Sequence, residues 1–282
     1  MSTAPAIDGT PLVAASPFEM RINLGRDLPE TDVRSALQNG DVGFLHSFTT
    51  GSAVDGPGVR LVIWTTSCMF RCRYCHNPDT WSLSNGMPVA VGRAVDEMRK
   101  YANGLKVMHG GLTISGGEPL MQKPFVMKMF EAARAMGIHT ALQTNGFYGS
   151  KLTDEDLKEI DLIILDMKAF SAAQHDRVTG IRDNKPVIEF CERLAALKRP
   201  MWLRYVLVPA LTDFDEEIRA MASFGASLDV VERVEVLPFH QMGRYKWERL
   251  NIPYDLEATE PPSRESVAHA VDIFRSAGLH CP

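Results

Sequence analysis

The sequence predicts an α/β fold, a partial (β/α)6 barrel with parallel strands, and three observations lead to this prediction. From Gly43 onward, apolar, β-rich runs alternate about six times with amphipathic stretches of helical length. Runs such as Leu162-Ile163-Ile164-Leu165 are apolar without alternation, which is typical of parallel strands covered on both faces. About six units, rather than the eight of a complete barrel, predict a barrel that does not close.

The repeating pattern places the elements as follows. The predicted strands comprise residues 59–66, 112–115, 139–143, 162–166, 201–208 and 233–237. The predicted helices comprise residues 91–104, 123–136, 154–159, 184–197, 213–224 and 263–276. Two of the helix starts carry capping signals. Asp213 followed by Glu216 resembles a capping box, and Ser263 after two prolines is in position for an N-cap.

Residues 1–40 differ in composition from the rest of the chain, which we expect to form one domain over residues 41–282. They include Pro5, Pro11, Pro17 and Pro29, no lysine, and a single aromatic residue. This composition is typical of an N-terminal extension that is flexible or lies over the surface. A short helix around residues 30–38 is the only regular element expected there, and an additional capping element is the alternative.

The composition excludes several classes of protein. Hydrophobic residues make up 45% and charged residues 23% of the 282 residues, which is ordinary for a globular chain and excludes a wholly disordered one. The net charge of −5 argues against non-specific nucleic-acid binding, which needs clustered Lys and Arg. No apolar run approaches the ~18 residues that span a bilayer. No charged-then-apolar signal sequence is present either, so we expect a cytoplasmic protein without a membrane partner.

Three of the five cysteines form the motif Cys68-x3-Cys72-x2-Cys75, directly after the first predicted strand. An odd number of cysteines with such a cluster favours metal or redox chemistry over disulfides. A four-iron cubane normally takes four thiolates, so three cysteines leave one iron open to another ligand. A structural zinc site is the alternative, but its fourth ligand would be His76, and adjacent residues seldom converge on one metal. A group of ordinary buried thiols is a further alternative.

The two remaining cysteines lie outside this motif. Cys191 lies among apolar residues of a predicted helix and is expected to be a small buried side chain. The penultimate Cys281 is expected to be an incidental exposed thiol. Neither of them is expected to bind a metal.

Polar and glycine-rich segments follow several of the predicted strands. They are Gly116-Gly117-Glu118 after the second strand, residues 144–146 after the third, Asp166 and Lys168 after the fourth, and His240 after the sixth. Ligands of parallel α/β folds bind at the carboxyl ends of strands, so we expect these segments to form one site. Paired glycines let the backbone approach a ligand closely, and a carboxylate suits an ammonium group.

The cysteine motif, with the aromatic Tyr74 before its last cysteine, resembles the signature of the radical S-adenosylmethionine (SAM) enzymes. Residues 115–119, Ser-Gly-Gly-Glu-Pro, are similar to the second signature of that family, which lies against the amino group of SAM. Further segments resemble the activating enzymes of glycyl radical enzymes. They are Thr49-x5-Asp55-Gly-Pro-Gly58, Cys75-His76-Asn77, Asp166-x-Lys168, Trp202-Leu-Arg204-Tyr205, and Leu237-Pro-Phe-His240 with Lys246-Trp247. In order and spacing the resemblance covers roughly residues 43–282.

This resemblance implies a radical SAM type of barrel and an enzyme with one [4Fe–4S] cluster on Cys68, Cys72 and Cys75, which binds SAM at the open iron. It implies reductive cleavage of SAM to a 5′-deoxyadenosyl radical, which removes a hydrogen atom from a glycine of a protein substrate. Some activating enzymes carry a ferredoxin-like insert with about eight further cysteines, and no cysteine lies between Cys75 and Gly116 here. The implied protein substrate is therefore pyruvate formate-lyase, in anaerobic metabolism.

Other readings of the resemblance stay open. The chain is alternatively an activase of another glycyl radical enzyme, or a radical enzyme that acts on a small molecule. A non-catalytic zinc or iron–sulfur protein is the alternative from another class, but it leaves Asp166 and His240 without a function. The resemblance implies flavodoxin or ferredoxin as the reductant, and we expect a monomer.

The resemblance also implies which residues serve the reaction. Those expected to contact SAM are Tyr74, Cys75, His76, Asn77, Gly116, Gly117, Glu118, Asp166, Met167, Lys168, Arg204 and His240. Asp55, Asp166 and Lys168 are the expected catalytic residues, with Asp55 touching the incoming peptide. Arg204 is alternatively paired with a structural acid, and Asp55 is alternatively a turn-forming residue.

One position departs from the pattern of the family. Activating enzymes commonly have Asp-Thr-Asn-Gly where this chain has Gln143 followed by Thr-Asn-Gly. That Asp is associated with a monovalent cation beside SAM. Glutamine offers only a neutral carbonyl ligand, so the resemblance leaves a cation site in doubt for this chain.

Overall fold

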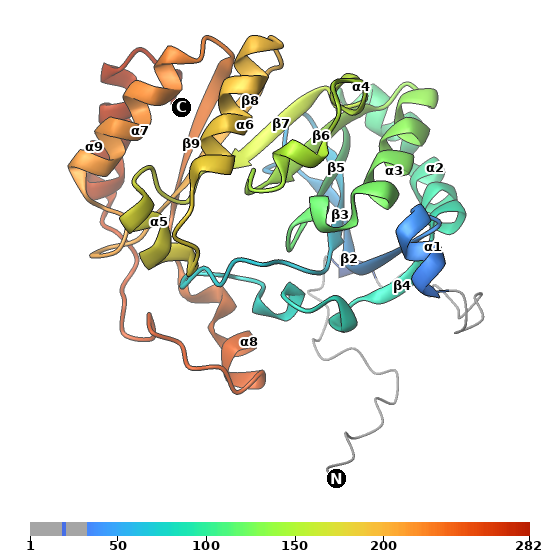
Figure 1. Ribbon diagram of the computed structural model, residues 1–282, viewed down its shortest axis with the longest axis horizontal. Helices are drawn as coiled ribbons and strands as arrows, with labels where there is room; N and C mark the ends of the chain where they lie inside the picture. The colour runs from blue at the N-terminus through green and yellow to red at the C-terminus, as the bar shows by residue number, and fades with distance from the viewer. Residues whose placement is uncertain (1–18, 21–32) are drawn as a thin grey trace.

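The computed structural model describes residues 19–20 and 33–282, whose elements are labelled in Figure 1. The strands are β1 (Glu19–Met20), β2 (Val42–Ser52), β3 (Arg60–Thr65), β4 (Met87–Ala90), β5 (Gly111–Gly116), β6 (His139–Thr144), β7 (Leu162–Asp166), β8 (Met201–Leu207) and β9 (Val231–Pro238). The α-helices are α1 (Val33–Asn39), α2 (Val91–Val107), α3 (Lys123–Ala135), α4 (Asp154–Lys158), α5 (Ala172–Thr179), α6 (Lys185–Ala196), α7 (Asp215–Ser227), α8 (Arg244–Arg249) and α9 (Arg264–Ser276). Three short 3₁₀ helices border the site: η2 (Pro78–Thr80), η4 (Pro119–Gln122) and η6 (Gln241–Gly243).

The described strands form one sheet, in the order β1-β2-β3-β5-β6-β7-β8-β9, with β4 paired to β2. Strands β3 and β5 to β9 run parallel to one another. Strands β1, β2 and β4 are antiparallel additions at one edge. In the part of the chain that the structure describes, β9 pairs with neither β1 nor β2, so the barrel stays open. The predicted partial (β/α)6 barrel is confirmed, whereas the antiparallel strands are not predicted by the sequence.

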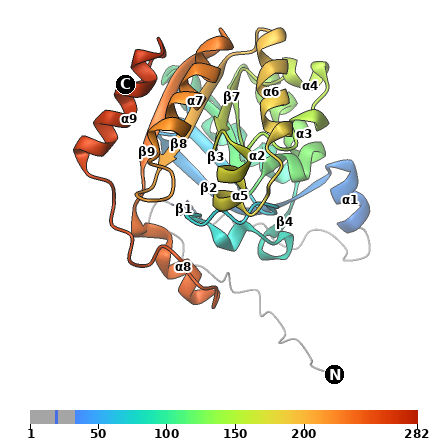
Figure 2. The same ribbon diagram turned by 60° about the vertical axis from the view of Figure 1, so that its left-hand side comes forward.

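Helices α2, α3, α4, α6, α7 and α9 lie along the outside of the curved sheet (Figures 1 and 2). The main apolar core fills the space between these helices and the sheet, and Leu142 and Leu165 belong to it. Their neighbours Ala141 and Ile164 point to the other side of the same strands, because side chains alternate along a strand, and pack there with Trp202. The parallel strands are therefore apolar on both faces, which explains their runs without alternation.

Two predicted helix starts have different outcomes. The hydroxyl of Ser263 accepts a hydrogen bond from the Ser266 N–H at 3.1 Å, which confirms this N-cap of α9. The capping box at Asp213 and Glu216 is wrong, because α7 starts two residues later, after Phe214, and no side chain in the described part of the chain caps it. The acidic residues of its first turn instead stand at the positive end of the helix dipole.

The N-terminal region is described only in part. The sequence predicts that residues 1–40 are flexible or lie over the surface, and most of these residues are outside the described part of the chain. The helix expected around residues 30–38 corresponds to α1, Val33–Asn39. Gly40 follows it with a φ of 76°, and a Cβ atom there would lie 2.4 Å from the backbone of Pro124. Glycine thus allows α1 to lie close to α3.

The two cysteines outside the motif are both buried. Cys191 is fully buried in the main core, as predicted. The prediction that Cys281 is exposed is wrong, because Cys281 is only 2% exposed and belongs to the same core. The Nε of Arg275 donates to the Cys281 carbonyl at 2.7 Å and so holds the chain end against α9.

No helix among residues 33–282 is long and apolar enough to cross a membrane.

Candidate active site

The cysteine motif lies in the loop after β3, at the carboxyl end of the parallel strands, where the sequence predicts the site. Ser67 starts this loop with a φ of 79°, in the left-handed region, which turns the chain out of the strand. The Ser67 N–H donates to the carbonyl of Thr80 at 2.7 Å, and the Cys68 N–H donates to that of Trp81 at 3.1 Å. The start of the loop is therefore fixed to the segment that follows it.

The three thiols of the motif are free, with Cys72 buried and Cys68 and Cys75 half-buried. Burial raises the pKa of the Cys72 thiol to about 12, and it raises the pKa of Cys68 and of Cys75 as well. These thiols are therefore protonated at neutral pH in the absence of a metal. Iron would bind them as thiolates and displace their protons. The loop packs on its own apolar cluster, apart from the main core. Three soft donors in one sheltered loop fit an iron–sulfur cluster.

The described residues contain no group of three or more His, Cys, Asp or Glu side chains arranged around a single metal position. In a four-iron cubane each cysteine binds a different iron, whereas the ligands of a zinc ion converge on one atom. His76, the candidate fourth ligand for zinc, stacks instead on His240, with ring centres 4.1 Å apart.

The turn at Gly116 and Gly117 packs directly on β3 and the cysteine loop. Gly116 has a φ of 123°, and a Cβ atom there would lie 2.1 Å from the carbonyl oxygen of Thr65. A Cβ atom on Gly117 would lie 2.5 Å from the carbonyl oxygen of Ser67. The Gly117 N–H donates to Thr65 at 2.9 Å, and the Glu118 N–H donates to Ser67 at 2.8 Å. With these donors used, the carbonyl oxygens of the turn are the groups suited to an ammonium ligand.

The carboxylate of Glu118 does not have the role that the sequence suggests. Its residue is fully buried, and its Oε1 accepts from the Leu120 N–H at 3.0 Å and from the Thr144 hydroxyl at 2.7 Å. Its Oε2 accepts from the Asn145 N–H at 2.8 Å. Burial raises the pKa of Glu118, against these hydrogen bonds. The expected pairing of this carboxylate with a ligand ammonium is therefore corrected: it joins the glycine turn to the end of β6.

Lys168 connects the end of β7 with the cysteine loop. Its ammonium lies 3.5 Å from Oδ2 of Asp166 and 5.7 Å from the ring centre of Tyr74. Burial lowers the pKa of Lys168, but the negative charges that face it, first that of Asp166, hold this pKa above its usual value. The Tyr74 hydroxyl is buried and has no hydrogen-bond partner among the described residues. An unpaired buried hydroxyl beside a cation fits a site that receives a polar ligand.

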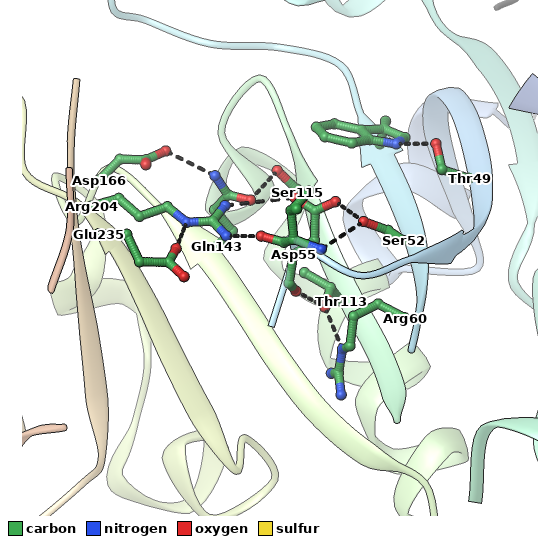
Figure 3. Close-up of polar contacts among 12 residues, drawn as sticks. Thr49, Ser52, Asp55, Arg60, Thr113, Ser115, Gln143, Asp166, Arg204 and Glu235 are labelled. Atoms are coloured by element: carbon green, nitrogen blue, oxygen red, sulfur yellow. Dashed lines mark hydrogen bonds and ion pairs between the residues drawn. The ribbon is translucent and has the colours of Figure 1, made fainter. Parts of the chain in front are cut away.

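Gln143 links three strands on the inner face of the sheet (Figure 3). Its Nε2 donates to Oδ2 of Asp166 at 3.2 Å, and its Oε1 accepts from the Ser115 hydroxyl at 3.0 Å. Beside them Met167 is buried, and its N–H donates to the carbonyl of Arg204 at 3.0 Å. The neutral amide of Gln143 thus donates to Asp166. An aspartate at position 143 would instead place a second negative charge beside Asp166, and this pair of carboxylates would require a cation.

Arg204 is paired with structural acids, one of the two alternatives that the sequence leaves open (Figure 3). Its Nε lies 2.6 Å from Oε2 of Glu235, and its Nη1 lies 3.6 Å from Oδ1 of Asp55. Its Nη2 donates to the Val54 carbonyl. Asp55 is 8% exposed, and its Oδ2 accepts from the Ser52 hydroxyl at 2.5 Å. Both oxygens of Asp55 are therefore engaged within the chain, and Arg204 holds its loop against β8 and β9.

His76 and His240 border a cavity of about 260 Å³ on the open side of the barrel. The cavity is lined by His46, Ser47, Thr49, Trp64, His76, Asn77, His240, Met242, Gly243 and Lys246. Burial, and then the charge of His240, lower the pKa of His76 to about 4, so both rings are neutral at neutral pH. The cavity thus combines neutral aromatic surfaces with the ammonium of Lys246.

The structure adds two residues of α8 to which the sequence analysis assigns no role. The Lys246 ammonium donates to Oδ1 of Asn77 at 2.8 Å and lies 3.2 Å from Oδ2 of Asp79. The indole N–H of Trp247 donates to the carbonyl of Cys75 at 2.8 Å. These contacts join segments far apart in the chain, and the only signal for them is the position of Lys246-Trp247 within the family pattern.

Comparisons with known proteins agree with this arrangement. Residues 62–224 match the model of the Radical SAM superfamily. A pyruvate formate-lyase-activating enzyme of Staphylococcus epidermidis is 41% identical over 235 residues, which are 81% of this chain and 93% of the relative.

Two solved structures are similar in fold. One is a domain of a pyruvate-formate lyase-activating enzyme from Bacteroides vulgatus, with a TM-score of 0.50 and 23% identity, covering 61% of this chain and 98% of that chain. The other is a radical SAM methyltransferase from Sphaerobacter thermophilus, with a TM-score of 0.59 and 15% identity, covering 91% of this chain and 81% of that one. The chain belongs to the radical SAM superfamily, whose members use a [4Fe–4S] cluster and SAM, and within it to the family of the pyruvate formate-lyase-activating enzymes.

Proposed function

We propose that this chain generates a glycyl radical on pyruvate formate-lyase, the protein that the relatives' name designates. The observation that carries this proposal is the contact between the two signature segments. Gly117 lies against the carbonyl of Ser67, next to Cys68, so that the glycine turn and the cysteine loop form one surface. A ligand of the open iron would meet the carbonyl oxygens of this turn.

We assign Cys68, Cys72 and Cys75 to the cluster. When bound, the cluster supplies one electron that breaks a carbon–sulfur bond of SAM, which gives methionine and the 5′-deoxyadenosyl radical. The carbonyl oxygens of Gly116 and Gly117 would accept hydrogen bonds from the amino group of SAM. The other walls of the site are formed by Asp166, Met167 and Lys168 on one side, and by Tyr74, His76, Asn77 and His240 on the other. Glu118, Arg204 and Asp55 hold these walls in place.

The open side of the barrel suits a polypeptide substrate. An extended segment can enter between the edges of the sheet, and a glycine allows close approach because it has no side chain. The proposed reductant is a flavodoxin or ferredoxin, and the proposed compartment is the cytoplasm, where thiols stay reduced. We propose a monomer in which residues 41–282 hold the whole site and residues 1–40 are an extension.

The test mixes reduced protein, SAM and inactive pyruvate formate-lyase without oxygen and records the electron paramagnetic resonance spectrum. A glycyl doublet is expected, together with 5′-deoxyadenosine. The Cys72→Ala variant is the matched control and should give neither. Cleavage of SAM without a radical on this partner would reject pyruvate formate-lyase and favour another glycyl radical enzyme as the substrate.

A further inference from the structure

The far side of the cysteine loop rests on the carboxyl end of α5. The Arg71 N–H donates to the carbonyl of Thr179 at 2.8 Å, and the Arg73 N–H donates to that of Val178 at 3.0 Å. These carbonyls belong to the last turn of the helix, where they have no partner within the helix. The loop between the cysteines, which lies beside α5 in Figure 1, therefore gives two of its amide donors to this helix.

A closed set of hydrogen bonds around His175 fixes this last turn. His175 Nδ1 lies 2.6 Å from the carbonyl of Ile181, and since a carbonyl only accepts, this nitrogen carries the proton. The Thr179 hydroxyl donates to the His175 carbonyl at 2.8 Å and accepts from the Ile181 N–H at 3.1 Å. The His175 ring meets Phe70 of the cysteine loop edge to face, with ring centres 5.2 Å apart.

Stability alone does not explain a histidine at this position. The residue is 2% exposed, and its Nε2 has no hydrogen-bond partner among the described residues. A buried acceptor without a donor costs free energy that a phenylalanine, with a ring of similar shape, would avoid. Burial lowers the pKa of His175, so the ring is neutral. What the histidine adds over a phenylalanine is the Nδ1–H donor to Ile181.

This donor bears on the chemistry of the cluster. Hydrogen bonds to the sulfurs of an iron–sulfur cluster stabilise its more negative reduced form and raise its reduction potential. Amides that donate to α5 cannot donate to those sulfurs, and the carboxyl end of a helix carries partial negative charge. Both effects favour the low potential that the reduction of a sulfonium requires.

We propose that His175 is a positioning residue that keeps the reduction potential of the cluster low, by locking the end of α5 so that it holds the Arg71 and Arg73 amides away from the cluster. The proposal rests on the proposed cluster at Cys68, Cys72 and Cys75. His175 contacts neither the cysteines nor SAM, and it acts only through the end of α5.

The test compares two substitutions in the cluster-loaded protein. His175→Phe keeps a ring against Phe70 but removes the donor, whereas His175→Asn keeps a side-chain N–H near the place of Nδ1. A redox titration followed by electron paramagnetic resonance should give a more positive midpoint potential for His175→Phe and a value near that of the wild type for His175→Asn. Hydrogen exchange of the Arg71 and Arg73 amides should be about fivefold faster in His175→Phe, the equivalent of one net hydrogen bond of ~1 kcal/mol.

A second variant and a control keep the test decisive. Thr179→Val removes both hydrogen bonds of the Thr179 hydroxyl at nearly constant volume and should shift the potential in the same direction. His139→Asn, in β6, is the control and should leave the potential unchanged. Equal potentials in the wild type, His175→Phe and Thr179→Val would overturn the proposal, as would an equal shift in His175→Asn. A wild-type protein that assembles no four-iron cluster would refute the proposed function instead.

Discussion

The indole N–H of Trp247 donates a hydrogen bond to the carbonyl of Cys75 at 2.8 Å, across 172 positions of the chain. This bond fixes α8, which lies below the strands in both views, to the last cysteine of the motif (Figures 1 and 2). Lys246 strengthens the attachment through Asn77 and Asp79. The segment after β9 thus supports the loop that we assign to the cluster, and the loop's geometry depends on a distant part of the sequence.

Replacing Trp247 by phenylalanine should weaken this support. Trp247→Phe leaves the Cys75 carbonyl without its donor, at a cost of ~1 kcal/mol. The melting temperature should fall by about 2–4 °C, and iron should be lost faster to a chelator. Trp202→Phe, on the inner face of the sheet away from the loop, is the control for the loss of an indole. An unchanged rate of iron release in Trp247→Phe would show that α8 does not support the cluster.

The five cysteines should fall into two groups. Anaerobic reconstitution should give a brown protein with one four-iron cluster per chain, and Cys68→Ala, Cys72→Ala and Cys75→Ala should each abolish it. Cys191→Ala and Cys281→Ala should keep the cluster and lose about 1–2 kcal/mol of stability, because both side chains are buried in the main core. Iron and sulfide analysis with absorbance spectra measures this. A full cluster in Cys72→Ala, or stoichiometric zinc in the native protein, would contradict the ligand assignment.

A carboxylate at position 143 should create a need for a cation. Gln143 donates to Asp166 at 3.2 Å, so Gln143→Asp replaces a donor with a second negative charge beside the first. Cleavage of SAM by this variant should be slower by about tenfold in buffer without Na⁺ or K⁺, and added K⁺ should restore it. The wild type should respond little to K⁺. A wild-type rate that depends on K⁺ as strongly as that of the variant would contradict this reading of Gln143.

Stability should fall as the pH drops below the ordinary pKa of histidine. Burial, and then the charge of Arg60, lower the pKa of His139 in the folded chain, so the unfolded chain binds more protons. The free energy of unfolding therefore gains a contribution from His139 above a pH of about 6.5 and loses it as the pH falls toward the folded pKa. Melting temperatures between pH 8 and 5 should decline less steeply in His139→Asn. Parallel curves for the two proteins would rule out His139 as a source of this dependence.

The sequence predicts the parallel part of the fold well because these strands are apolar on both faces. An apolar run such as residues 162–166 predicts a buried strand and not an exposed loop, and the structure has β7 at Leu162–Asp166. β2 escapes prediction because its 11 residues mix apolar with polar side chains, as expected of an antiparallel strand at the edge. The short helices α5 and α8 escape as well, because they carry little periodicity and are held by contacts with the cysteine loop.

The site is predictable in its position and less so in its contacts. The motif spacing places Cys68 and Gly117 at neighbouring strand ends, and the structure brings their segments together. The Thr144 partner of Glu118 lies 26 positions away in the chain, and the Glu235 partner of Arg204 lies 31 positions away, so nothing local indicates these contacts. Cys281 illustrates the same limit, because its penultimate position gives no sign of the packing that buries it in the main core.

The most direct test of the central claim follows one hydrogen atom. Pyruvate formate-lyase carrying glycine deuterated at Cα is activated with this protein, a reductant and unlabelled SAM, and the 5′-deoxyadenosine formed is analysed by mass spectrometry. Deuterium should appear in 5′-deoxyadenosine in step with the glycyl signal, because the radical generated in this site takes its hydrogen from that glycine. Unlabelled 5′-deoxyadenosine accompanied by a full glycyl signal would contradict direct transfer, and with it the account of the site given by the cysteine loop, the glycine turn and the open barrel.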